Sequence, residues 1–209
     1  MKGFYNSIRL KKEVLGFFYK NTRFIFMSLS LVLGVLAGTL AFKSGFFSDG
    51  SLYSNLFSSF VSSRTKLSAF GIFLNSFAGN LIFLLVSFCC GLFLFGKPLS
   101  FAVPFFKGVG LGCICSSAYS VMGIEGMAFC TLIILPGAFV FSCVLLYCCL
   151  SAGQFSSELY SCCFFDGSED FKPKFKKYCI GFIKYISITV FGSLIDCLTV
   201  SLFSGAFSL

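Results

Sequence analysis

The sequence predicts an all-α protein, a polytopic integral membrane bundle of five transmembrane helices that forms one transmembrane domain over residues 1–209. Hydrophobic residues make up 57% of the chain and charged residues only 11%, whereas a soluble domain of this length needs a far more polar surface. Five apolar runs approach or exceed the roughly 20 residues that a helix needs to cross about 30 Å of hydrocarbon. The basic residues gather at alternate gaps between these runs, which is typical of a membrane protein with a defined orientation.

The five predicted spans cover residues 24–42, 70–95, 102–121, 127–151 and 180–203. The first run follows basic residues as a secretory signal would, but it is too long and four more spans follow, so we expect an uncleaved first helix. Lys97 and Pro98 predict a tight turn at 96–101 between the second and third spans, and residues 152–179 predict a solvated charged loop. Pro136 removes a backbone hydrogen bond within the fourth span, which predicts a kink that serves either bundle shape or a hinge.

The charge distribution predicts a cytoplasmic N-terminus and an extracytoplasmic C-terminus. With that orientation the inner side carries thirteen basic residues and the outer side three, in agreement with the positive-inside rule. The inner set is Lys2, Arg9, Lys11, Lys12, Lys20, Arg23, Lys97, Lys107, Lys172, Lys174, Lys176, Lys177 and Lys184, and the outer set is Lys43, Arg64 and Lys66. Topology and contact with the lipid bilayer therefore account for the net charge of +8, and no nucleic-acid partner is expected.

The largest outer segment, residues 43–69, predicts a short amphipathic helix after the first span. Apolar side chains that include Leu56 and Phe60 recur at helical spacing, and serines fill much of the rest. This helix either packs over the mouth of the bundle or offers a binding surface to a partner.

The residue inventory predicts neither an enzyme nor a cofactor site. The chain has no histidine, which excludes a histidine base and an imidazole metal ligand. The eight carboxylates are scattered, and the twelve cysteines lack zinc-site spacing, so we expect no catalytic, cofactor-binding or metal-binding residues. Most of the cysteines lie within spans, where they serve as small packing residues.

Small residues recur at four-residue spacing in three spans, which predicts close helix contacts in lipid. The three ridges are Ser30, Gly34 and Gly38 in the first span, Gly71, Asn75 and Gly79 in the second, and Gly108, Gly112 and Ser116 in the third. These ridges pack either within one bundle or between copies in a homo-oligomer.

Four polar residues within the spans are candidates for a functional or a structural role: Asn75, Asn80, Lys107 and Asp196. Lys107 is predicted to lie near the inner end of its span and to extend its ammonium group to the interface. Asp196 lies deeper and needs a partner inside the bundle, such as Asn75, Asn80 or a backbone group. Asn75, Asn80 and Asp196, together with Pro136, are compatible with the polar pathway of a small transporter or permease subunit.

Several short motifs resemble the stage II sporulation protein M family. They are Phe105-Phe106-Lys107-Gly108-Val109-Gly110-Leu111-Gly112, Met122-Gly123-Ile124-Glu125-Gly126, Leu135-Pro136-Gly137, and Leu33-Gly34-Val35-Leu36-Ala37-Gly38 after a basic N-terminus. The resemblance extends over nearly the whole chain in length, span count and order, although cysteine and phenylalanine are more abundant than is typical of the family.

The resemblance implies a multi-pass protein of the bacterial cytoplasmic membrane. Its role would be that of a non-enzymatic anchor and scaffold in forespore engulfment. Its partners would be the peptidoglycan-degrading stage II sporulation proteins D and P, which carry the catalysis.

Overall fold

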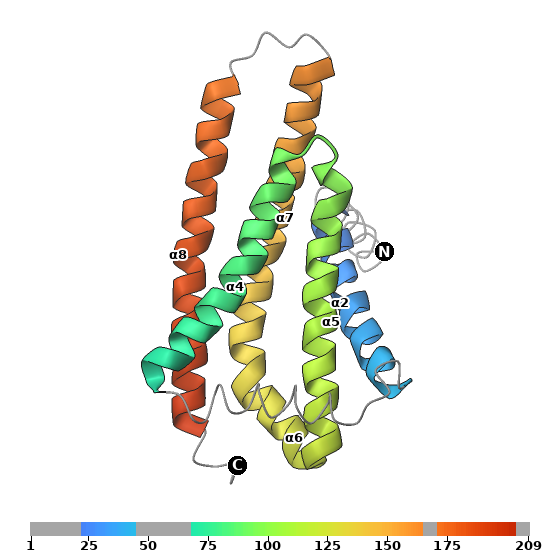
Figure 1. The fold of residues 1–209 in the computed structure, drawn as a ribbon, viewed down its shortest axis with the longest axis vertical. Coiled ribbons are helices and arrows are strands. Elements are labelled where there is room, and N and C mark those ends of the chain that lie inside the picture. The colour runs from blue at the N-terminus through green and yellow to red at the C-terminus, as the bar shows by residue number, and fades with distance from the viewer. Residues whose placement is uncertain (1–21, 45–67, 165–170, 204–209) are drawn as a thin grey trace, which may run out of the picture.

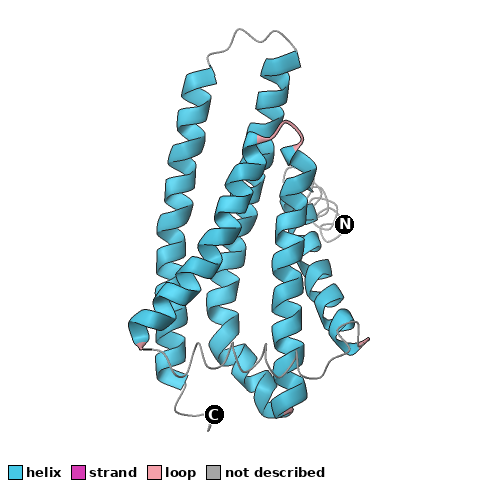
Figure 2. Cartoon of the chain, in the orientation of Figure 1, coloured by secondary structure: helices cyan, strands magenta, loops and turns pink. Residues whose placement is uncertain are grey.

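The computed structural model describes residues 22–44, 68–164 and 171–203. The predicted amphipathic helix, with Leu56 and Phe60, falls on residues outside this description. All regular elements in the described ranges are helices (Figure 2). They are α2 (Thr22–Lys43), α4 (Ala69–Leu92), α5 (Gly96–Met122), α6 (Ile124–Phe129), the π-helical segment η1 (Cys130–Ile134), α7 (Leu135–Phe164) and α8 (Phe171–Phe203).

Five helical segments are long and apolar enough to cross a membrane, which confirms the predicted number and order of spans. The segments α6, η1 and α7 follow one another without interruption and together make the fourth of these spans. The helices run in alternating directions side by side, with α4 crossing obliquely in front of α7 (Figure 1). We call the end of the bundle that carries the α4–α5 connection the turn end, and the opposite end the α6 end.

The turn between α4 and α5 is shorter than predicted. The predicted turn at 96–101 is wrong, because α4 ends at Leu92 and α5 begins at Gly96. Pro98 lies in the first turn of α5, where the missing N–H has no intrahelical acceptor to lose. At the other end, the α5–α6 hairpin turns on Gly123 alone, whose φ of 61° favours glycine.

The predicted charged loop at 152–179 is also wrong, because most of it is helical. Helix α7 continues to Phe164 and α8 begins at Phe171, so the two helices extend together past the α4–α5 turn (Figure 1). The Tyr178 ring of α8 stacks on Phe155 of α7 and Phe88 of α4, with centroid distances of 4.4 and 5.0 Å. Its hydroxyl donates a hydrogen bond of 3.0 Å to the Phe88 carbonyl, so this extension is fastened to the bundle.

The predicted disturbance at Pro136 is present as a π-helical turn. Residues Cys130–Ile134 form the π-helix immediately before Leu135 and Pro136, and the Leu135 N–H bonds to the Cys130 carbonyl. The Thr199 hydroxyl of α8 donates to the Ile133 carbonyl at 3.3 Å. A side chain of a neighbouring helix thus donates a hydrogen bond to the backbone of the π-helical turn.

The ridges of the first and third spans pack against each other. A Cβ atom added at Gly34 or Gly38 would overlap the carbonyl oxygens of Phe105 or Val109 in α5. A Cβ atom at Gly108 or Gly112 would likewise overlap carbonyl oxygens of α2. Both helices therefore need glycine at these positions so that their backbones can touch, as in other close helix pairs in lipid.

Candidate functional site

Helix α4 carries two polar side chains one turn apart on the face that meets the other helices. Ser76 and Asn80 are related by four residues, so they lie above one another on the helix surface. Ser76 contacts α8, and Asn80 contacts α5. Helix α4 therefore links a polar group of each of these two helices.

Lys107 is directed into the bundle and not to the membrane interface. It lies 11 residues after the start of α5 at Gly96, about 16 Å along the helix and near its middle. Its ammonium donates a hydrogen bond of 3.2 Å to Asn80 Oδ1. The ammonium also lies 4.9 Å from the ring centroid of Phe83 and 4.7 Å from that of Phe141. The predicted extension to the interface is therefore wrong, because these three groups hold the charge inside.

Asp196 of α8 is 3% exposed and meets two other helices. Its Oδ2 atom accepts a hydrogen bond of 2.7 Å from the Ser76 hydroxyl. On its other side lies Gly137 of α7, where an added Cβ atom would stand 2.8 Å from Asp196 Oδ1. The carboxylate thus fits into the bundle only because the residue after Pro136 has no side chain.

The two charged side chains belong to one polar cluster, which we define as Ser76, Asn80, Lys107 and Asp196. Its contacts fall on successive turns of α4, at Ser76 for Asp196 and at Asn80 for Lys107. Each charge alone would disfavour insertion by about 2.5–3.5 kcal/mol at mid-membrane, and the hydrogen bonds with α4 offset part of that cost.

Two other residues that the sequence analysis singled out, Asn75 and Gly79, lie outside the polar cluster. Asn75 is exposed on the outward face of α4, and Gly79 has open space where a Cβ atom would stand. Asn75 and Gly79 of the second ridge therefore do not lie at a helix contact within the described part of the bundle. The structure gives Ser76 as a hydrogen-bond partner of Asp196, a residue that the sequence did not indicate for this contact.

Sequence reasoning missed four residues that shape the cluster: Ser76, Phe83, Gly137 and Phe141. Ser76 and Gly137 could have been found from their positions beside stronger signals, one before Phe77-Ala78-Gly79-Asn80 and one after Pro136. The two phenylalanines carry no signal of their own in a chain with 32 of them. In the described ranges, no three His, Cys, Asp or Glu side chains gather as a metal site, and all twelve cysteines are free thiols.

The comparison with protein families matches residues 23–207 to the model described as stage II sporulation protein M. The chain belongs to the stage II sporulation protein M family. The match includes all of the five spans except Thr22, and the whole polar cluster, so the cluster lies within the family domain of this chain. No curated protein and no solved structure matches the chain significantly.

Membership in the stage II sporulation protein M family agrees with the resemblance that the motifs around Lys107 and Pro136 indicate. The structure adds what those motifs do. Gly108 and Gly112 seat α5 on α2, and Gly137 after Pro136 leaves room for Asp196.

Proposed function

We propose that this member of the stage II sporulation protein M family is a non-enzymatic membrane scaffold. It would anchor peptidoglycan-degrading partners, such as stage II sporulation proteins D and P, during forespore engulfment. We place it in the cytoplasmic membrane of a bacterium with the turn end inside. The support for this orientation is that Arg23, Lys97 and the lysines of 172–177 lie at the turn end, whereas Lys43 lies at the α6 end.

The observation that carries the scaffold role is that both charged residues of the polar cluster are bonded within the bundle. Lys107 and Asp196 bond to side chains of α4 and are packed by aromatic rings and by Gly137. Neither of the two hollows described below is lined by these charged residues. Charges that are bound in this way hold α4, α5 and α8 together, which suits a rigid anchor.

A small transporter or permease subunit is the second candidate. One observation favours it: Asp196 lies beside the π-helical turn and Gly137, and π-helical turns in membrane helices often occur at functional sites. In that function the segment around Pro136 would move and open a path to the carboxylate.

Site-specific photo-crosslinking in sporulating cells tests the scaffold role. A crosslinking amino acid in place of Ile124, which is 83% exposed at the α6 end, should capture the peptidoglycan-degrading proteins. The same amino acid in place of Phe164, which is 65% exposed beyond the turn end, is the matched control and should not capture them. Absence of these proteins from the Ile124 set, with normal engulfment in cells that lack the gene, would contradict the proposal.

A further inference from the structure

A lengthwise groove opens between α2, α5 and α7 on the outside of the bundle. Helix α2 packs closely on α5 through its glycines but has few contacts with α7. A gap therefore remains between α2 and α7. The groove has a volume of about 460 Å³. Its lining includes Ser28 and Val35 of α2, Leu111 of α5, Thr131 of η1, and Ala138 and Ser142 of α7.

The groove is closed towards the turn end and continues to the α6 end. Next to its last lining residue, Leu146, the rings of Phe24 and Tyr147 meet at 5.3 Å and join α2 to α7. In the other direction the lining reaches Cys130 and Met127. From Cys130 to Leu146 the groove follows the helix for 16 residues, about 24 Å, which is most of the thickness of the hydrocarbon layer.

The length and cross-section of the groove determine which kind of molecule can occupy it. A volume of about 460 Å³ over roughly 24 Å gives a mean cross-section of about 20 Å². A helix 10–12 Å wide needs about 80 Å² or more, so a partner helix would lie along the open side of the groove without filling it. The same volume holds about 15 groups of the size of a water molecule, at roughly 30 Å³ each, and a methylene group is of similar size. One acyl chain of a membrane lipid has these dimensions.

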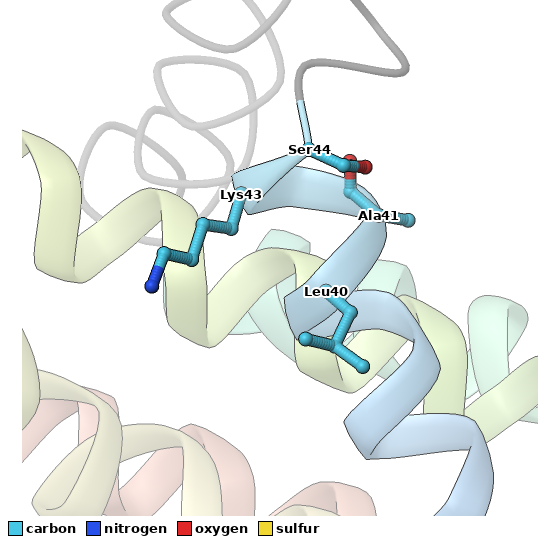
Figure 3. A pocket seen from close by; sticks show the side chains of 4 residues that line it. All are labelled: Leu40, Ala41, Lys43 and Ser44. Atoms are coloured by element: carbon cyan, nitrogen blue, oxygen red, sulfur yellow. The ribbon is translucent and has the colours of Figure 1, made fainter.

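Beyond the groove, α2 leads to a basic residue at the α6 end. Lys43 follows Val32 of the groove wall by 11 residues, close to three full turns, so both lie on the same face of α2. Lys43 is exposed at the α6 end and lines a second hollow of about 620 Å³ with Leu40, Ala41 and Ser44 (Figure 3). A lysine ammonium at the membrane surface attracts anionic headgroups.

We propose that the groove between α2, α5 and α7 is a binding site for one anionic phospholipid. The acyl chain lies in the groove, and the phosphate meets the Lys43 ammonium at the α6 end. This site is separate from the polar cluster and does not depend on the scaffold role.

Native mass spectrometry of the purified protein tests the site, with equal amounts of phosphatidylglycerol and phosphatidylethanolamine added in detergent. The unmodified chain should retain one phosphatidylglycerol. Ser142→Phe fills the groove and should reduce the retained lipid at least threefold. The matched control is Ser187→Phe on the exposed face of α8, which should leave retention unchanged. Lys43→Gln should remove the preference for the anionic headgroup.

A second measurement uses the unmodified chain and so does not depend on how a variant folds. Cys143 lines the groove, so bound phosphatidylglycerol should slow its alkylation by a maleimide at least threefold relative to delipidated protein. An unchanged alkylation rate would overturn the proposal, as would equal lipid retention by Ser142→Phe and the unmodified chain. Retention of a peptide in place of a lipid would overturn it as well.

Discussion

Replacement of Asn80 tests whether the hydrogen bond to Lys107 holds α4 against α5. Asn80→Leu keeps the side-chain size but removes the acceptor that lies 3.2 Å from the Lys107 ammonium. A hydrogen bond to a charged group contributes about 1.5–3 kcal/mol, so we expect the free energy of unfolding to fall by about 2 kcal/mol. Asn75→Leu is the matched control, because it makes the same change on the exposed face of the same helix. It should change stability by less than about 0.5 kcal/mol.

A double-mutant cycle isolates the pairwise energy. In a Lys107→Met background, Asn80→Leu should lose its effect, which gives a coupling energy of about 2 kcal/mol. Unfolding can be followed in bicelles during titration with sodium dodecyl sulfate. A thiol-reactive dye reports the transition, because Cys148 and Cys149 are buried in the native bundle. Equal losses for the two asparagine variants, or a coupling energy below about 0.5 kcal/mol, would refute the reasoning.

Three further predictions concern packing. Gly34→Leu should prevent correct pairing of α2 with α5 and abolish a folded peak in size-exclusion chromatography, whereas Gly79→Leu, at an open position, should elute as the unmodified chain does. Gly137→Ala places a methyl group against Asp196 and should destabilise the bundle by about 1–3 kcal/mol in the same titration; no loss would mean that the carboxylate has room to move. Tyr178→Phe keeps both ring stacks but loses one hydrogen bond, so its unfolding free energy should fall by about 0.5–1.5 kcal/mol, and a larger fall would show that the hydroxyl has a further role.

The spans could be predicted because the apolar run that gives the hydropathy signal also forms most of each membrane-crossing helix. The first predicted span, 24–42, differs from α2 (Thr22–Lys43) by no more than two residues at either end. The prediction failed where a helix continues past the apolar run. Lys172, Lys174 and their neighbours end the hydropathy signal, but charged residues are compatible with helix, and α8 continues through them.

The sequence identified the charged members of the polar cluster but did not predict their contacts. Residue spacing shows which side chains share a helix face, but not which helix that face meets. The spacing around Gly34 and Gly108 therefore predicted a contact face on each helix correctly. It did not predict that these two faces contact each other. Lys107 was predicted too close to the interface because its helix begins at Gly96, six residues before the predicted start. That shift moves the ammonium from the interface to the level of Asn80.

The central claim is that the intramembrane charges hold helices together and carry nothing across the membrane. Proton flux into liposomes that contain the purified protein tests this claim most directly. We predict that the unmodified chain and Asp196→Asn both give the flux of empty liposomes. Flux above that level that Asp196→Asn abolishes would contradict the account and establish a transport path.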